Sequence, residues 1–406
     1  MIKNFWNTTT VSPNGTWPSS VPDYVETLII GAGGAGLSTA IAMALRGYKE
    51  LLIVDSMLPG WRGARKGIGA ATLMGCPPHY LYSQGISAPD SFRALALCKV
   101  GIKNVNEYVQ RFWPDQDWCR KSNYGGFHFA KDLEEEKMLA DVNKYYQIGQ
   151  VSSSLMKGEA ISKLTDMNIG HAGVFIPNEC MVNPAKFFNG IITGIRKLGV
   201  DILSGFTVDT LYQEGLHWVV SDIMGNIIRC KYLVVATGAN LGALPINDQL
   251  DEFITRKRVT YFATPEILNH RLNPYVVSTL DGSEVYRRYE NRIVGCIDTM
   301  DGVPVDLKEP DKSALAKALH RVSVLYPLTD KEKTFDFIWT KNVLQTKDTL
   351  PIVGKVNELK NLFLNIGYNH HSLAWQMVGG AVIAELILGS NTAVGLDIFS
   401  PERIFK

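Results

Sequence analysis

The sequence predicts an α/β protein in which a domain of parallel strands and helices is interleaved with an α+β domain built on an antiparallel sheet. One observation is a strand, helix, strand pattern between Thr27 and Asp55. Another is a series of short β-like runs between Val259 and Asp298 that turn residues separate. The third is the length of 406 residues, which exceeds one small core, so two domains are expected.

The first pattern carries a glycine fingerprint at its first turn. An apolar run at residues 28–30 leads into G-x-G-x-x-G, formed by Gly31, Gly33 and Gly36, and helix formers follow. In this spacing the glycines allow, in order, a tight turn, the approach of a pyrophosphate to bare backbone, and close packing of helix on strand. The helix N-terminus then attracts the phosphate charge.

An acidic residue ends the second strand of this pattern. Asp55 follows the apolar run 51–54 and stands roughly 20 residues past the glycines, where a carboxylate that binds ribose hydroxyls belongs. Small residues also mark strand-to-helix turns that bind nothing. The order of strand, helix, strand and Asp55 therefore carries the prediction of a dinucleotide site.

Composition restricts the partners. Lys plus Arg number 41 and Asp plus Glu 40, a balance that argues against nucleic acid and anionic membrane. The six cysteines form no C-x-x-C, which suggests a reducing compartment and no metal site. No uncharged apolar run reaches the roughly 18 residues of a membrane helix. We therefore expect a cytoplasmic protein without an integral membrane segment, as a monomer or homo-oligomer.

A second glycine-rich stretch follows Asp55. It reads PGWRGARKGIGAATLMG and contains Arg62, Arg65 and Lys66. Many glycines let backbone lie against a flat ligand, and the basic residues could face phosphate or the negative charge of a reduced flavin. A mobile solvated loop is the alternative.

The remaining chain reads as alternating helices and strands. An irregular arm, pinned by its aromatic residues, precedes them. The expected elements are helices at Leu37–Arg46, Ser91–Trp113, Lys131–Gln147, Pro184–Leu198 and Ser313–Tyr326, a strand around Thr207–Leu211, two strands closing on Ala236–Gly238, a meander over Val259–Asp298, the β run FDFIW, and a last strand, turn and helix ending at Gly389.

Together these blocks resemble the FAD-dependent D-amino-acid-oxidase superfamily, which includes glycine oxidase, sarcosine oxidase and γ-glutamylputrescine oxidase. The resemblance covers nearly the whole chain. Its blocks are GAGGAG with Asp55, a divergent GASG-x-x-G loop at residues 63–67, LVVATGAN at 233–240, W…T-x-D-x-x-P-x-x-G from Trp339 to Gly354, and the C-terminal G…H…GG…AELI-x-G helix.

The resemblance implies a Rossmann-like FAD-binding domain interleaved with an antiparallel-sheet α+β substrate domain. The predicted arm is residues 1–23, and its Phe5-Trp6 pair resembles the lead-in of the γ-glutamylputrescine oxidase branch. The predicted FAD-binding domain comprises residues 24–90, 150–250 and 335–406, and the substrate domain 91–149 and 251–334.

The resemblance also assigns the cofactor site residue by residue. His370 and His371 stand in the strand-to-helix turn where the family's backbone N–H groups meet flavin O2. The predicted FAD-binding residues are Gly31, Gly33, Gly34, Ala35, Gly36, Asp55, Ser56, Arg62, Gly63, Ala64, Arg65, Gly67, Ile68, Gly69, Val208, Ala236, Thr237, Gly238, Gly354, Gly367, Tyr368, Asn369, His370, His371, Ser372 and Leu373.

Two departures from the family pattern concern substrate and acceptor. Glycine-oxidase-like members place a carboxylate-binding Arg four residues after Trp339, where this chain has Val343, and an aliphatic side chain cannot replace a bidentate guanidinium. Lys341 and Arg287 are candidate substitutes, so an α-amino-acid substrate is disfavoured but not excluded. Sarcosine-oxidase-like members place an oxygen-activating Lys where Ile293 aligns, which leaves O2 or another electron acceptor open.

The implied chemistry is hydride transfer to flavin N5 from a carbon bearing an amine, with water hydrolysing the imine. No obligatory side-chain base is expected. The candidate catalytic residues are Tyr261 and Tyr286 as a cage for a small amine or amino acid, Trp339 as a wall, Lys341, and His371 near the flavin pyrimidine. For each tyrosine, packing as a half-buried strand residue is an equal alternative.

Two other functions remain open at this point. A nicotinamide-dependent dehydrogenase shares the glycine fingerprint, but the GYNHH turn and the ATG block argue against it. A flavoprotein that binds FAD within a complex without oxidising small amines is the second, because the family's Arg and Lys positions are lost.

Overall fold

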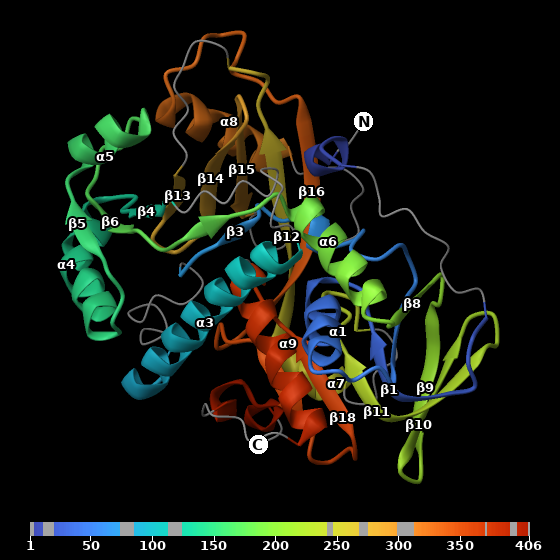
Figure 1. Cartoon of the computed structure of the whole chain (residues 1–406). Coiled ribbons are helices and arrows are strands. Elements are labelled where there is room, and N and C mark those ends of the chain that lie inside the picture. The colour runs from blue at the N-terminus through green and yellow to red at the C-terminus, as the bar shows by residue number, and fades with distance from the viewer. Residues whose placement is uncertain are drawn as a thin grey trace.

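The computed structural model describes residues 4–10, 20–73, 85–112, 124–241, 247–267, 275–298, 312–369, 372–389 and 396–404. His370 and His371 lie outside the described residues, as does the side chain of Ser372. The described chain forms two eight-stranded sheets and one two-stranded sheet (Figure 1).

The first sheet contains the predicted strand–helix–strand unit. Its strands are β1 (Tyr24–Ile30), β2 (Leu51–Asp55), β8 (Asp201–Ser204), β9 (Val208–Glu214), β10 (His217–Asp222), β11 (Ile227–Val235), β17 (Ile352–Lys355) and β18 (Leu362–Ile366). The five central strands run parallel in the order β18, β11, β1, β2, β8. Most of their residues are buried and apolar, as expected for parallel strands covered on both faces.

Four helices cover one face of the first sheet (Figure 1). They are α1 (Gly34–Leu45), α3 (Ala88–Phe112), α6 (Pro184–Lys197) and α9 (Ser372–Leu388). The α9 helix lies directly against α1, because a Cβ on Gly380 would overlap the backbone of Ser38. A second apolar cluster, which includes Trp218, covers the opposite face.

The second sheet is antiparallel except for one pair. Its strands are β4 (Gly126–Phe129), β5 (Ser154–Met156), β6 (Gly173–Ile176), β12 (Ile254–Ala263), β13 (Val276–Thr279), β14 (Glu284–Tyr289), β15 (Arg292–Asp298) and β16 (Phe337–Thr346). They lie in the order β16, β12, β15, β14, β13, β4, β6, β5, and only β13 and β4 are parallel. Alternate side chains therefore form an inner face and an outer face; we call inner the face that carries Tyr261 and Trp339.

This strand order corrects two details of the prediction. The expected meander holds for β13, β14 and β15, but β12 pairs with β15 and β16 rather than with β13. Strands β5, β6 and β16 fall in ranges assigned to the FAD-binding domain, yet they pair within the second sheet. The division into domains otherwise stays a prediction.

The predicted helices are present with small shifts at their ends. The largest are at their starts, since Leu37 and Ser91 were expected where α1 begins at Gly34 and α3 at Ala88. No described helix has the length and hydropathy to span a bilayer. The other elements are α4 (Leu133–Ile148), α5 (Gly158–Thr165), α7 (Asn247–Phe253), α8 (Lys312–Leu325), β3 (Ala70–Ala71), β7 (Cys180–Met181), and 3-10 helices η1 (Phe5–Thr8), η2 (Ala64–Lys66), η4 (Leu396–Phe399) and η5 (Pro401–Arg403).

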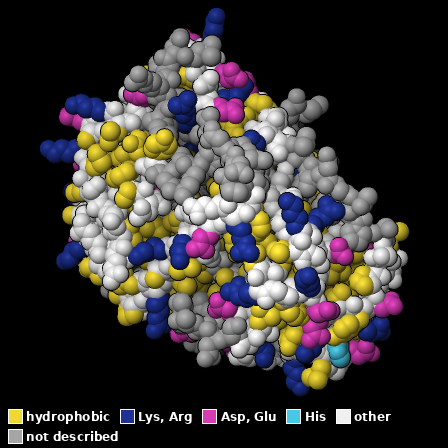
Figure 2. Space-filling view, in the orientation of Figure 1, with side chains coloured by type: hydrophobic (Ala, Val, Ile, Leu, Met, Phe, Trp, Pro, Cys, Tyr) yellow, Lys and Arg dark blue, Asp and Glu magenta, His cyan; other side chains and the backbone are white. Residues whose placement is uncertain are grey.

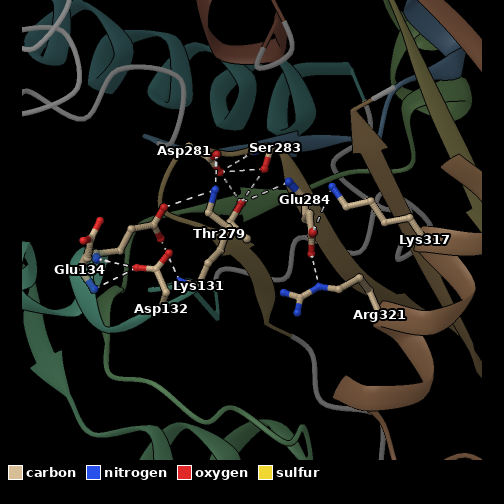
Figure 3. A network of polar contacts seen from close by, with 10 residues as sticks. Lys131, Asp132, Glu134, Thr279, Asp281, Ser283, Glu284, Lys317 and Arg321 are labelled. Carbon is tan, nitrogen blue, oxygen red and sulfur yellow. Dashed lines mark hydrogen bonds and ion pairs between the residues drawn. The ribbon is translucent and has the colours of Figure 1, made fainter. Parts of the chain in front are cut away.

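Charged side chains of both signs are interspersed over the face in Figure 2. On the outer face of the second sheet they form a local network (Figure 3). Lys131 Nζ lies 2.7 Å from Asp281 Oδ2 in the turn between β13 and β14. Glu284, which is almost fully buried at the start of β14, accepts a hydrogen bond of 2.9 Å from Arg321 Nε of α8. This pair anchors α8 to the sheet.

We expect Arg321→Met to destabilise the apoprotein by about 2 to 4 kcal/mol, because it leaves the buried Glu284 carboxylate without its nearest cation. Lys317→Met is the matched control. Lys317 lies 4.0 Å from the same carboxylate but is half exposed, so its loss costs less than about 1 kcal/mol. Urea unfolding of both variants measures the difference, and equal effects would contradict this account of the anchor.

Candidate functional site

The fingerprint turn joins β1 to α1, and its glycines have different surroundings. Gly31 has a φ of +108°, and a Cβ on it would lie 2.5 Å from the carbonyl oxygen of Ala236 at the end of β11. A Cβ on Gly36 would overlap the carbonyl oxygen of Gly31. Around the Cβ position of Gly33, the described chain places no atom within 4 Å except its own chain neighbours. Packing therefore requires Gly31 and Gly36, whereas Gly33 faces space open to a ligand.

This open space lies at the N-terminus of α1. The first helical hydrogen bond runs from Leu37 N to Gly33 O at 2.9 Å. The N–H groups of Gly34, Ala35 and Gly36 thus have no acceptor inside the helix, and no side chain caps Gly33. Unpaired N–H groups and the helix dipole make this a site for a phosphate.

Asp55 and Thr237 flank the turn. The Asp55 carboxylate accepts 2.8 Å hydrogen bonds from Ala32 N through Oδ2 and from Met57 N through Oδ1. Burial raises the pKa of Asp55, although these two bonds oppose the shift. The hydroxyl of Thr237 is buried and has no hydrogen-bond partner within the described chain. A buried hydroxyl without a partner is rare, and a bound ligand would satisfy it.

The glycine loop, defined here as residues 60–69, accepts hydrogen bonds from donors outside the loop. Four consecutive or near-consecutive carbonyl groups accept hydrogen bonds from distant segments. The bonds run from Asn4 Nδ2 to Arg65 O (3.2 Å), Trp339 Nε1 to Lys66 O (2.9 Å), Arg287 Nη1 to Ile68 O (3.0 Å) and Val182 N to Gly69 O (2.8 Å).

The other polar groups of the loop remain available. The N–H groups of Gly67 and Ile68 have no acceptor among the residues that the structure describes. Cβ atoms on Gly63 and Gly67 would meet only Lys341, at 3.9 Å from its Cε and Nζ respectively. One side of the loop therefore offers N–H donors beside an amine, with room for a flat ring. Together with the space at Gly33 and the Thr237 hydroxyl, these features fit FAD.

The inner face of the second sheet supplies an aromatic and apolar wall. Tyr261 and Trp339, on paired strands, are buried and stacked with ring centroids 5.7 Å apart and an interplanar angle of 14°. Val343 and Cys296 belong to the same buried cluster. Two predicted catalytic residues, Tyr261 and Trp339, are thus brought together beside the glycine loop.

Lys341 lies between Trp339 and Val343 on β16, on the same face. Burial lowers the pKa of Lys341 to about 8; Cys296 opposes this shift, and the charge of nearby Lys66 adds to it with a smaller effect. Burial also lowers the pKa of Lys66. The predicted residue Lys341 is therefore a cation near neutral pH that titrates close to the working range of an enzyme.

The structure does not bring Tyr286 to this wall. Its side chain belongs to the cluster on the outer face, where its hydroxyl donates to Glu284 Oε2 at 2.9 Å. Burial, with the charge of Glu284, raises the pKa of Tyr286 well above its usual value. Figure 3 shows Glu284 beside Arg321 of α8. As part of an amine cage, Tyr286 is a wrong prediction.

Arg287 lies on the inner face but is engaged by the protein. Its Nη1 donates to Ile68 O at 3.0 Å and to Val182 O at 2.7 Å. Its guanidinium carbon lies 5.6 Å from the ring centroid of Trp6 and 5.8 Å from that of Tyr289. Arg287 therefore supports the glycine loop, and Lys341 is the better candidate for a relocated carboxylate clamp.

Arg62 and Arg65, two basic residues of the loop, differ in burial and in their contacts. Arg62 is exposed, and its Nε lies 3.0 Å from Met57 Sδ, near Asp55. Arg65 is fully buried, with its guanidinium 5.6 Å from the ring centroid of Trp61, and burial lowers its pKa. The two predicted cofactor contacts thus face different surroundings.

The predicted cofactor residues that the structure describes between Gly354 and Leu373, here called the late block, mostly serve packing. A Cβ on Gly354 would meet Pro401 at 3.0 Å, and one on Gly367 would meet Thr346 at 2.9 Å. Tyr368 is buried and donates to Asn365, and burial raises its pKa. Asn369 Nδ2 donates to Thr349 O and its Oδ1 accepts from Thr346 N, so both ends of its amide hold β16 and the turn after it. Leu373 lies in the core. These side chains are directed into the protein.

Other predicted residues line the carboxyl edge of the first sheet. Ser56 follows β2, Ala236 to Gly238 follow β11, and Val208 begins β9. Ala64 starts η2 in the glycine loop. Their FAD contacts stay predictions. Sequence reasoning missed Asn4 and Val182, because a donor 61 or 113 residues from its acceptor leaves no local pattern.

Comparisons with known proteins agree with this geometry. A family model described as FAD dependent oxidoreductase matches residues 26–386. "Probable oxidoreductase OrdL" of Haemophilus influenzae is 20% identical over 397 residues, covering 93% of this chain and 86% of its own. The gamma-glutamylputrescine oxidoreductase of Escherichia coli is 23% identical over 397 residues, covering 90% and 84%.

Solved structures share the fold. Glycine oxidase from Geobacillus kaustophilus matches with a TM-score of 0.76 at 17% identity, covering 93% of this chain and 98% of its own. L-proline dehydrogenase from P. horikoshii matches with a TM-score of 0.80 at 18% identity, covering 95% and 99%. The predicted fold class, family and FAD cofactor are confirmed.

We expect Gly33→Ala and Gly36→Ala to fail in different ways. A methyl group on Gly33 enters open space, so the apoprotein should keep its melting temperature but bind FAD at least about tenfold more weakly, because the methyl group stands where the pyrophosphate approaches. A methyl group on Gly36 overlaps Gly31 and should destabilise the apoprotein by about 1 to 3 kcal/mol. Thermal unfolding of apoprotein and FAD titration by fluorescence separate the two. Unchanged FAD affinity in Gly33→Ala would remove the cradle assignment.

Proposed function

The chain belongs to the family of FAD-dependent oxidoreductases, and we propose that it oxidises a C–N bond of a small amine or amino acid to an imine. FAD would accept the hydride at its N5 atom, and O2 would be the electron acceptor. The names of three relatives support the substrate class, since γ-glutamylputrescine, glycine and proline all carry an amine nitrogen on a saturated carbon.

The observation that carries the proposal is the aromatic wall beside the glycine loop. The stacked rings of Tyr261 and Trp339 give an apolar surface for the carbon skeleton of a substrate. Lys341 stands beside them and next to the glycines of the loop. A substrate lying against this wall, beside the loop, would have its reacting carbon shielded from water, which strengthens every charge interaction there.

The reaction removes a hydride from carbon while the nitrogen lone pair forms the C=N bond and the nitrogen loses a proton to water. FAD, when bound, accepts the hydride. An ammonium group has no lone pair, so the amine must react in its neutral form. The positive charge of Lys341 disfavours a second cation nearby and thus lowers the pKa of the bound amine. Water then hydrolyses the imine.

The proposal of O2 as acceptor also rests on Lys341. Ile293, which aligns with the family's oxygen-activating Lys, is buried among residues of the outer face and points away from the loop. Negative charge develops on O2 as it is reduced, and a fixed cation nearby stabilises that charge. Lys341 is such a cation.

A second candidate is an amino-acid oxidase in which Lys341 has taken over the carboxylate. Lys341 is two residues from Val343 on the same face of β16. A point-charge ammonium holds a carboxylate less specifically than a bidentate guanidinium does. This candidate therefore predicts looser discrimination among amino acids.

We expect small primary and secondary amines to bleach the flavin at least about tenfold faster than glycine, sarcosine or D-alanine under anaerobic stopped-flow conditions, because a buried carboxylate without a guanidinium partner pays an uncompensated desolvation cost. Readmission of O2 should restore the colour and yield hydrogen peroxide. Faster bleaching by amino acids, lost in Lys341→Met, would establish the second candidate instead. Bleaching by none of the compounds would indicate a protein that binds FAD without oxidising small amines.

The pKa of Lys341 gives a pH prediction. The ammonium form is present below about pH 8, so acetate, used as a carboxylate probe, should bind with constant affinity below that pH and about tenfold more weakly per unit above it. In Lys341→Met the affinity should be low and independent of pH. The exposed Lys347, just past the end of β16, provides the control variant Lys347→Met. Acetate affinity in the wild-type protein that does not change between pH 7 and 10 would contradict a charge role for Lys341.

A further inference from the structure

We infer that the N-terminal arm, residues 4–10, and Arg287 form a latch that holds the glycine loop in its cofactor-binding conformation. Arg287 is then a positioning residue for FAD rather than a substrate ligand. The inference depends on FAD binding at the glycine loop and not on which substrate is oxidised.

The arm is built into the core although it precedes the first strand. Phe5 and Trp6 are buried in the cluster on the inner face of the second sheet. Trp6 packs edge-on against Tyr289 with ring centroids 5.0 Å apart, and Phe5 packs against Phe337 at 5.3 Å. Figure 1 shows η1 beside β16 and α6. Such burial fixes the position of the residue that precedes the aromatic pair.

That residue, Asn4, joins the arm to the loop. Its Oδ1 accepts from Trp6 N at 3.1 Å, which caps η1, and its Nδ2 donates to Arg65 O at 3.2 Å. Both ends of the amide are therefore used, and its orientation follows from the two bonds. Displacement of the arm would leave the Arg65 carbonyl without this donor.

Arg287 joins the same loop to the second sheet. It comes from β14, and its guanidinium lies against both the Trp6 and the Tyr289 ring. One nitrogen, Nη1, donates to Ile68 O and Val182 O and thus fixes the distance between the loop and the segment before α6. A buried guanidinium requires such acceptors, and the aromatic faces stabilise its charge.

A third connection closes the network. Asn183 caps the N-terminus of α6, accepting from Lys186 N, and its Nδ2 donates to both Thr9 Oγ1 and Tyr289 OH at 2.8 Å. The arm, the loop, β14 and the start of α6 therefore share one set of contacts. None of these segments is adjacent to another in the sequence.

The latch acts on the groups that a flavin meets. With the carbonyls of Arg65 and Ile68 held by donors outside the loop, the N–H groups of Gly67 and Ile68 remain without acceptors in the described chain. These donors and the Arg287 charge favour negative charge on a ring beside the loop. The latch should thus affect both FAD affinity and the ease with which the ring accepts negative charge.

The test compares Arg287→Met with Arg288→Met. Arg288 is the next residue of β14, exposed on the opposite face, and its Nε donates to the carbonyl of Glu290. Arg287→Met should raise the FAD dissociation constant at least about tenfold, since Ile68 O and Val182 O lose the hydrogen bonds that the buried guanidinium donates. In samples saturated with FAD, it should also weaken sulfite binding to the flavin, which reports stabilisation of negative charge on the ring. Arg288→Met should change neither.

A milder pair of variants keeps the test decisive if Arg287→Met does not fold. Asn4→Ala removes one donor to the loop and should weaken FAD binding about three- to tenfold, whereas Asn7→Ala, exposed on the same arm, should have no effect. A fall in melting temperature with unchanged FAD and sulfite affinities in both Arg287→Met and Asn4→Ala would overturn the latch. Neither measurement requires a substrate, so failure here is distinct from failure of the proposed oxidation.

Discussion

The glycine loop imposes the constraint on which the site depends. A loop that must lie flat against a ligand cannot fold its carbonyl groups into a helix or a long ladder, and yet buried carbonyls require donors. The protein meets this need with side chains from elsewhere, namely Asn4, Arg287 and Trp339. Each donor comes from a different segment: Arg287 and Trp339 are buried, and Asn4 directly precedes the buried Phe5 and Trp6. The shape of the cofactor surface is thus determined by the assembly of arm, second sheet and first sheet, not by the loop sequence alone.

Sequence reasoning could find those parts of the site whose residues interact with near neighbours in the sequence. Gly31, Gly36 and Asp55 lie within one continuous strand–helix–strand unit, and the steric need for two of these glycines is visible in their contacts. Helices with an apolar face were likewise found to within a turn. The late block matched the family in its glycines and in Tyr368, but the structure gives those residues packing roles that no local pattern distinguishes from cofactor contacts.

The alternation of strand side chains explains why the aromatic wall was only partly predicted. Adjacent residues of a strand face opposite ways, so an error of one position exchanges the two faces. Tyr286 and Arg287 are such neighbours, and the aromatic residue expected at the substrate proved to face α8, while the arginine faces the loop. Which face is inner depends on the order of the strands, and β12 sits between β15 and β16, an arrangement set by contacts distant in sequence. Composition of the strands cannot reveal it.

Residues of β18 and α9 orient the N-terminal end of α1 from outside the open space at Gly33. Asn365 on β18 donates through Nδ2 to the carbonyl of Ala35 and to Thr39 in the first turns of α1, and the hydroxyl of Ser38 donates to the carbonyl of Gln376 on α9. The N-terminal end of α1, where the pyrophosphate is expected, is therefore oriented by residues over 300 positions later in the chain. Since the arm near the other end of the sequence holds the glycine loop, the two halves of the proposed FAD site are positioned by segments far apart in the sequence. Neither half of this proposed site takes its conformation from its own segment alone.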